Sequence, residues 1–454
     1  MALTIDGFAG SGTFAHGVHP PGNKMFSTEM AIEVIPSPSK VLLPLSQHVG
    51  APCQSIVKPK QSVAFGEMVA KGGGFVSAAL HAPITGTIQK NVVTTLPQGR
   101  RVEAIVIKAD GEQLDGDALY EEILGGEWSA RGLEKFDAQQ ISNAIHEAGI
   151  VGLGGAAFPT HVKLMSNDKM NIDTMLINGC ECEPFLTCDY RMMIEAAGPI
   201  ITGALLAARA VGAKNIAICI EDNKPRAIDV LQKAAVGTGI KIVVLKTKYP
   251  QGSEKQLIMA VTKRAVPLGG LPMNVGVAVS NVGTIAAVAR SVQKGKPLTH
   301  RVVSITGGGI VNPKNLLVPI GTPIRELFDY CGGFKKNAAR VISGGPMMGF
   351  AFTNFDAPVT KGTSGITVLT AEDVAKSKET ACVRCGRCVD ACPMNLVPTR
   401  IALASRNKDI DLAEQYNIMA CFECGACAYT CPANIPLVQL IRTGKGLIMA
   451  SKKK

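Results

Sequence analysis

The sequence is poor in aromatic and charged residues and contains a single Trp. Charged residues make up 18% and aromatic residues 5% of the 454 residues, whereas about a quarter of the residues of a globular protein are usually charged. With 46% hydrophobic residues the chain has enough apolar surface to fold, so disorder throughout is excluded. It also lacks a tripeptide repeat, which excludes a collagen-like chain. Few aromatic residues and no helix-turn-helix or zinc-finger spacing leave nucleic-acid binding unsupported, and we expect none.

A long uninterrupted apolar run is missing as well. The longest stretch without charge, residues 265–289, is broken by Pro267, Gly269, Gly270 and Pro272, and a membrane span must satisfy its backbone hydrogen bonds internally. The first residues have neither the basic nor the apolar region of a secretory signal. We therefore expect a soluble or peripheral protein of the cytoplasm. The formal net charge of +11 favours an acidic partner, an anionic cofactor or a negatively charged membrane surface.

Cysteine, in contrast, is abundant, and eight of the 14 cysteines form two runs with one spacing. The runs are Cys382-x2-Cys385-x2-Cys388-x3-Cys392-Pro393 and Cys421-x2-Cys424-x2-Cys427-x3-Cys431-Pro432. They repeat at an offset of 421 − 382 = 39 residues. This spacing is the bacterial pattern for two [4Fe–4S] clusters. A structural zinc module is the alternative, although it normally uses two CxxC pairs.

In paired runs the fourth cysteine of each run binds the cluster of the other run. We therefore assign one cluster to Cys382, Cys385, Cys388 and Cys431, called the outer cysteines below. The second cluster takes Cys421, Cys424, Cys427 and Cys392, called the inner cysteines. Two clusters at close range form a path for single electrons.

The rest of the chain predicts an α/β multidomain protein. Short apolar runs between Gly and Pro predict a small β domain, and alternating helical and strand patterns predict a mostly parallel sheet. The β domain resembles a biotinyl/lipoyl-type barrel sandwich but has no lysine in residues 75–81, so we expect a structural or docking role. The expected units are an arm (1–35), a barrel-sandwich-like β domain (36–125), an α/β domain (135–295), a β-grasp-like domain (300–352), a linker (353–378) and a largely helical cysteine domain (379–445).

A glycine-rich run, residues 152–160, lies in the α/β domain. Its glycines, Gly152, Gly154 and Gly155, allow close approach of a flat ligand or of phosphate to the backbone. The run follows a predicted helix, whereas a dinucleotide fingerprint follows a strand. A closely packed turn is therefore the alternative. Polar stretches after the predicted strands, beginning at Asn178, Tyr249 and Ser280, lie where an open sheet binds ligands.

These motifs resemble the C subunits of the Rnf complex, a membrane-bound, ion-translocating ferredoxin:NAD+ oxidoreductase, from one end of the chain to the other. The resemblance is carried by residues 17–21, 44–50, 81–86, 152–160, 178–191, 249–256 and 343–349 and by both cysteine runs. The central part is also similar to the flavoprotein subunit of respiratory NADH:quinone oxidoreductase, which binds FMN and NADH. The resemblance implies that residues 135–295 bind FMN and NADH, that residues 300–352 are SLBB-like, and that the chain docks on the cytoplasmic face of the cell membrane.

The second resemblance also implies site residues. Gly152, Gly154 and Gly155 match glycines that cradle the flavin. Phe158 matches an aromatic residue beside the dinucleotide, and Lys163 matches a lysine near the flavin. The further matches are Asn178, Glu183, Gly252, Glu254 and Asn281, with Glu183 and Glu254 expected to face the nucleotide. The chain departs from that flavoprotein at Leu153, Ala157, Cys180 and Ser253. Cys180, Cys182 and Cys188 have no known cluster spacing, so we expect structural thiols.

The combination predicts an enzyme subunit that exchanges hydride between NAD(H) and FMN and single electrons with two [4Fe–4S] clusters, without a general acid or base. The implied partners are the other subunits of the membrane complex and, indirectly, ferredoxin. Two alternatives remain. One is a soluble NADH-dependent flavin/iron–sulfur reductase similar to cobalamin reductase, and the other is an electron relay without catalytic activity.

Overall fold

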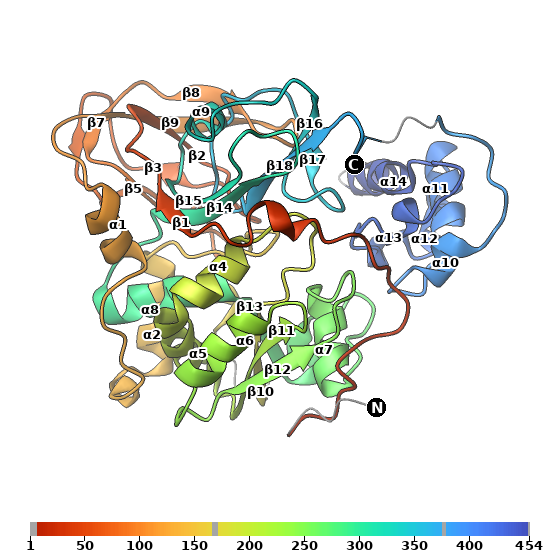
Figure 1. The fold of residues 1–454 in the computed structure, drawn as a ribbon, viewed down its shortest axis with the longest axis horizontal. Helices are drawn as coiled ribbons and strands as arrows, with labels where there is room; N and C mark the ends of the chain where they lie inside the picture. Colours follow the sequence, from red (N-terminus) through yellow and green to blue (C-terminus); the bar gives the residue numbers. More distant parts are fainter. Residues whose placement is uncertain (1–6, 166–170, 375–377, 453–454) are drawn as a thin grey trace.

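The structure is a computed structural model that describes residues 7–165, 171–374 and 378–452. A main body contains three β-rich or α/β units, and a helical lobe, which holds the paired cysteine runs, lies at one side of it (Figure 1). The N-terminal arm, with the 3-10 turn η1 (Lys24–Phe26), runs along the main body and past the lobe.

The N-terminal unit is a β sandwich of two antiparallel sheets. One sheet has the order β2-β9-β7-β4, with β8 also paired to β9, and the other has the order β3-β5-β6. Alternate residues of β9 are buried at its start, and Ile105 and Ile107 are fully buried, as expected of a strand with one face on the core. The strands are β2 (Lys40–Pro44), β3 (Gln54–Ser55), β4 (Ser62–Val63), β5 (Met68–Lys71), β6 (Leu80–His81), β7 (Gly86–Ile88), β8 (Val92–Thr95) and β9 (Arg101–Ala109). The helix α1 (Gly116–Ile123) and the turn η2 (Leu133–Lys135) lead to the next unit.

The central unit is a four-stranded parallel sheet of order β12-β11-β10-β13 covered on both faces. Ile177 and Ile218 pack on the face covered by α5 and α8, whereas Leu176 and Val279 pack on the opposite face with α7. The strands are β10 (Thr174–Asn178), β11 (Asn215–Glu221), β12 (Lys241–Leu245) and β13 (Val277–Asn281). The helices are α2 (Ala138–Glu147), α3 (Thr160–Lys163), α4 (Cys188–Glu195), α5 (Ala197–Val211), α6 (Pro225–Ala234), α7 (Glu254–Thr262), η3 (Pro272–Val275) and α8 (Val282–Lys294). The expected mostly parallel α/β layer is confirmed.

The third unit is a six-stranded mixed sheet of order β1-β15-β14-β18-β16-β17. Two of its strands lie outside the expected domain of residues 300–352: β1 comes from the arm, and β18 from residues expected to be a linker. All six residues of β18 are buried, because it lies between β14 and β16 in the middle of the sheet. The elements are β1 (Ile32–Val34), β14 (His300–Thr306), β15 (Lys314–Pro319), α9 (Ile324–Tyr330), β16 (Ala338–Ser343), β17 (Phe350–Ala351) and β18 (Gly365–Thr370).

The lobe is helical, as predicted, and has its own small core around Leu396, Ile401, Ile418 and Ile441. Its elements are α10 (Arg387–Asp390), α11 (Pro398–Arg406), α12 (Ile410–Gln415), η4 (Ile418–Ala420), α13 (Ala426–Tyr429) and α14 (Leu437–Ser451). Among the described residues no single helix has the length and apolar character needed to cross a membrane. Helices α4 and α5, which meet at 95°, together have the length and composition of a membrane span, and these two criteria alone select them.

Candidate functional site

The glycine run forms a loop between α2 and α3 that folds back on itself. The Gly152 amide donates to the Phe158 carbonyl at 2.8 Å, and the Leu153 amide donates to the Thr284 hydroxyl at 2.8 Å. A Cβ on Gly154 would come within 3.0 Å of the Asn281 side chain, so this position must be small to allow that contact. A Cβ on Gly155 would have no described atom within 4 Å. The loop therefore packs on the sheet through Gly154 and leaves an open face beside Gly155, as a flat ligand requires.

The carboxyl ends of β10 and β13 bring two predicted residues side by side, because Asn178 and Asn281 are partners in the parallel ladder. The Asn281 side chain accepts hydrogen bonds from the Gly283 and Thr284 amides, at 2.9 and 3.3 Å. It thereby caps the first turn of α8. The Asn178 side chain donates to the Gly252 carbonyl at 2.7 Å. The two asparagines thus connect the sheet edge to the two loops that border it.

Lys163 and Glu254 also come together at this edge. The Lys163 ammonium lies 2.5 Å from the Glu254 carboxylate and donates to the Val279 carbonyl at 3.0 Å. Both side chains are about one-third exposed, so the pair can be reached by a ligand. Phe158 is half-buried in the adjacent glycine loop. Gln251 precedes Gly252, and its buried side-chain amide has no partner among the residues that the structure describes.

Glu183 contacts a different unit. Its carboxylate accepts hydrogen bonds from the Met347 and Met348 amides, at 3.3 and 2.8 Å, in the loop between β16 and β17. Burial raises the pKa of Glu183 to about 7, although these two amides favour the charged form. The structure therefore places Glu183 against the third, β-grasp-like unit. Its carboxylate already has two hydrogen-bond partners in the protein.

Several residues that hold the site were not found from the sequence. The Lys24 ammonium, from the arm, donates to the carbonyls of Glu181, Glu183 and Leu186 at 2.6–3.1 Å. The Lys224 ammonium donates to the Cys180 carbonyl at 2.5 Å. The half-buried Lys24 and the buried Lys224 thus fix the loop that follows β10. Nothing in the sequence around Lys24 indicates this contact, since more than 150 residues separate its partners from it.

The glycine loop is likewise held by residues from other units. The Arg301 guanidinium, from β14, donates to the Leu153 carbonyl at 3.2 Å and also to the Lys361 carbonyl. The fully buried Lys361 ammonium donates to the carbonyls of Gly149 and Ala79, each at 2.6 Å. Burial lowers the pKa of Lys361 to about 8. Arg301 and Lys361 therefore fix the glycine loop at Leu153 and at Gly149, just before it begins. Lys361 also connects the loop to the β sandwich through Ala79.

The four inner cysteines line one apolar cavity in the lobe together with Leu396, Ile401 and Ile441. Burial, together with the nearby Cys421 and Cys392, raises the pKa of Cys424 to about 12. Four thiols from both repeats around one cavity match the donor set of a [4Fe–4S] cluster, which binds them as thiolates.

The outer cysteines lie closer to solvent. Cys382 and Cys385 are exposed and Cys388 is buried. Burial raises the pKa of Cys388, and the proximity of Cys431 from the other repeat adds to the increase. This proximity agrees with the exchange of the fourth cysteine between repeats.

The inner cysteines are attached directly to the α/β unit. The Tyr249 hydroxyl donates to the Cys424 carbonyl at 2.6 Å, and the Gln256 side chain donates to the Pro393 carbonyl at 3.1 Å. Cys182 packs in the same apolar group as Tyr249 and Cys424, and its sulfur accepts from the Gly252 amide at 3.3 Å. Residues 249–256 therefore border both the candidate ligand site and the inner cysteines.

Comparisons with known proteins agree with this division. Four family models match: "RnfC Barrel sandwich hybrid domain" over residues 12–112, "Nuo51 FMN-binding domain" over 145–290, "SLBB domain" over 302–351 and "4Fe-4S dicluster domain" over 381–435. The expected fold class is thereby confirmed. Together with the site, these matches define a multidomain iron–sulfur flavoprotein of the electron-transfer class.

Two relatives cover nearly the whole chain. The C subunit of the Na(+)-translocating ferredoxin:NAD(+) oxidoreductase complex of Acetobacterium woodii is 44% identical over 98% of both chains. The C subunit of the proton-translocating complex of Clostridium ljungdahlii is 44% identical over 90% of this chain and 88% of its own. The chain therefore belongs to the family of C subunits of ion-translocating ferredoxin:NAD(+) oxidoreductase complexes. A crystal structure of an NAD+-reducing [NiFe]-hydrogenase is 18% identical, with a TM-score of 0.49 over 72% of this chain and 64% of its own, which is too low to add to this assignment.

Proposed function

We propose that this chain is the peripheral subunit through which electrons enter or leave a membrane-bound, ion-translocating ferredoxin:NAD+ oxidoreductase. It exchanges hydride between NAD(H) and bound FMN, and single electrons between the FMN and two [4Fe–4S] clusters. The observation that carries the proposal is the double contact of residues 249–256. Gly252 and Glu254 border the candidate flavin site, whereas Tyr249 and Gln256 bond to backbone next to the inner cysteines.

When bound, FMN accepts two electrons as a hydride and releases them one at a time, and each [4Fe–4S] cluster carries one. The chain's own residues supply position and environment. The open face beside Gly155 admits the flat ring, and the Lys163–Glu254 pair offers charged contacts at the sheet edge. Gly152, Gly154, Phe158, Asn178, Glu183, Gly252 and Asn281 complete the proposed FMN and NADH site.

The inner cysteines would hold the cluster nearer the flavin, because their cavity adjoins residues 249–256. The outer cysteines would hold the second cluster, at the exposed side of the lobe. Electrons from NADH would pass from flavin to inner cluster to outer cluster, and the reverse order would produce NADH.

We assign the barrel sandwich to residues 36–125, the flavin domain to 135–295 and the cluster domain to 379–445.

We further propose that the chain docks on the cytoplasmic face of the cell membrane and exchanges electrons with the other subunits of the complex, and through them with ferredoxin. The relatives belong, by their names, to ion-translocating complexes. The net charge of +11 suits a negatively charged membrane surface.

The test is an anaerobic titration of the reconstituted full chain with NADH after its iron, sulfide and FMN contents have been measured. Bleaching of the flavin band together with reduction of the clusters supports the proposed route. If the clusters are fully loaded, FMN binds and NADH changes neither spectrum, the proposed catalytic function is wrong. A chain that binds clusters but no FMN would be an electron relay.

A further inference from the structure

The two cysteine runs carry equivalent loops with opposite environments. Residues 422–426, the inner loop, correspond to residues 383–387, the outer loop, at the offset of 39 residues. The inner loop is covered by the main body: a Cβ on Gly425 would lie 2.6 Å from the Met347 carbonyl oxygen. Glu423 within it is bonded to Arg442 and Lys445, at 2.7 and 2.8 Å. The inner loop is thus a docking surface that the chain itself occupies.

The outer loop is bare. All of its residues are exposed, Val383 to 65%, and a Cβ on Gly386 would meet no described atom within 4 Å, whereas the equivalent Gly425 is covered. Figure 1 shows α13, which begins in the inner loop, nearer the main body than α10, which begins in the outer loop. The repeat therefore presents one occupied and one free copy of the same surface.

The two loops also differ in charge. Arg384 stands where the inner loop has Glu423, and Arg387 stands where it has Ala426. Neither arginine makes an ion pair with any residue that the structure describes. Glu379, the acidic residue nearest to Arg384 along the chain, is paired with Arg406 instead. Two unpaired cations thus flank exposed cluster ligands, an arrangement that attracts an acidic surface.

We propose that the outer loop is the docking surface for an acidic one-electron redox protein or subunit, which Arg384 and Arg387 attract to the outer cluster. The proposal rests on the proposed function, because it requires a cluster at the outer cysteines. The step transfers one electron between the outer cluster and an oxidised or reduced centre on the partner, forms no bond and moves no proton. Charge complementarity of this kind increases the association rate and sets the salt dependence of binding.

The experiment uses the reconstituted full chain and, as the probe, an acidic two-[4Fe–4S] ferredoxin. The dissociation constant is measured at several salt concentrations, and the rate of electron transfer from the reduced probe to the chain is measured in parallel. We expect binding to weaken steeply as ionic strength rises, since exposed charges are screened within about 10 Å at 0.1 M salt. The double variant Arg384→Glu/Arg387→Glu should bind at least about tenfold more weakly at low salt.

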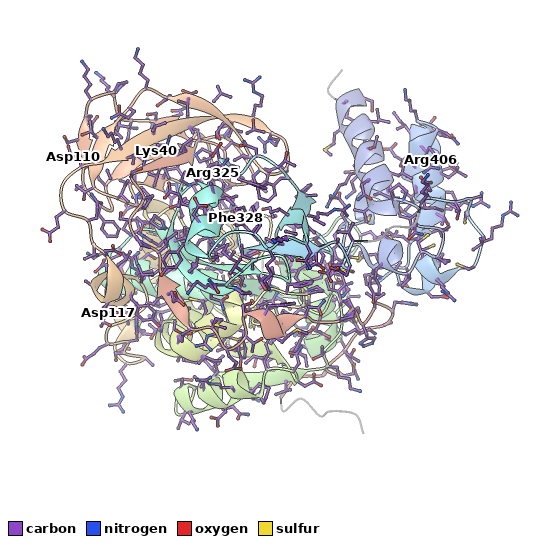
Figure 2. All side chains as sticks on the ribbon, turned by 45° about the horizontal axis from the view of Figure 1, so that its top comes forward. Lys40, Asp110, Asp117, Arg325, Phe328 and Arg406 are labelled. Carbon is purple, nitrogen blue, oxygen red and sulfur yellow. The ribbon has the colours of Figure 1, made fainter. Side chains whose placement is uncertain are left out.

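A matched control reverses two exposed lysines elsewhere, Lys40→Glu/Lys108→Glu, which are cross-strand partners in the β sandwich. Figure 2 labels Lys40 on the main body, far from the lobe that carries Arg406. This control changes net charge equally and should leave probe affinity almost unchanged. A neutral variant, Arg384→Gln/Arg387→Gln, serves if charge reversal prevents loading of the outer cluster, and it should flatten the salt dependence.

Equal weakening by the control would show that net charge alone attracts the probe, and it would overturn the proposal. Binding of wild-type chain to vesicles of anionic lipid through Arg384 and Arg387, without affinity for the acidic ferredoxin, would overturn it too. Reduction of the clusters by NADH is measured in the same samples. If NADH fails to reduce wild-type clusters, the proposed function fails, whereas normal reduction with salt-independent probe binding rejects the docking surface alone.

Discussion

Residues 249–256 border both the candidate flavin site and the inner cysteines, yet the glycine loop of that site and the inner cysteines are built in different ways. The loop is held by Thr284 from its own unit and by Arg301 and Lys361 from the β-grasp unit and its surroundings. The inner cysteines come from two short segments of one lobe with its own apolar core. Cluster binding therefore depends on local sequence, whereas flavin binding depends on how three units pack.

The largest expected effect is the loss of one cluster from the lobe. Cys424→Ser and Cys385→Ser should each remove about four of about eight iron atoms per chain, because each removes a ligand of a different cluster. Iron analysis measures this loss. Both variants should retain FMN in proportion to protein, since the glycine loop has its own supports. Loss of FMN together with the iron would show that the two regions are not independent.

The second prediction concerns the supports of the glycine loop. Arg301→Met leaves the Leu153 and Lys361 carbonyls without their donor, and a buried unsatisfied group costs about 1–3 kcal/mol. We expect FMN to bind at least about tenfold more weakly while the iron content remains normal. Flavin fluorescence titration measures the affinity.

Arg290→Met is the matched control for that variant. Arg290 is also buried and donates to backbone carbonyls, those of Glu122 and Pro297. These partners lie outside the glycine loop, so the loss of Arg290 should lower stability without a comparable loss of FMN affinity. Equal losses of affinity in both variants would mean that general destabilisation, and not support of the loop, explains the effect.

A smaller effect is expected from Glu183, which joins the α/β unit to the β-grasp unit. Burial raises its pKa from 4.5 to about 7, so the folded chain binds more protons than the unfolded chain between these pH values. The contribution to stability is complete below pH 4.5 and is lost as pH rises to about 7, by at most ~3 kcal/mol. Glu183→Gln should therefore show a shallower fall in unfolding free energy than wild type over this range, measured by urea denaturation. Parallel curves for the two chains would contradict this assignment.

Much of the site could be predicted where the signal is local or periodic. The cysteine spacing predicted both sets of cluster ligands, which the iron analysis above tests. The strand pattern predicted Asn178 at a strand end and Asn281 in a polar turn after a strand, and the structure has them as the paired last residues of β10 and β13. Contacts across units could not be predicted, because Lys24 and Arg301 act on carbonyls far along the chain, to which any residue could contribute. The same reason explains why β18 was expected to be part of a linker. Its short apolar run lies between glycine- and threonine-rich segments, and only its pairing with β14 and β16 makes it a strand.

The order in which NADH reduces the two clusters tests the proposed electron route. Rapid freeze-quench EPR, after the anaerobic chain is mixed with NADH, should show the inner cluster reduced before the outer one, with signals identified from Cys385→Ser and Cys424→Ser. In Cys424→Ser, which lacks the inner cluster, the outer cluster should remain oxidised on the time scale of wild-type reduction. Reduction of the outer cluster at the wild-type rate in that variant would contradict the route from flavin through residues 249–256 and the inner cysteines.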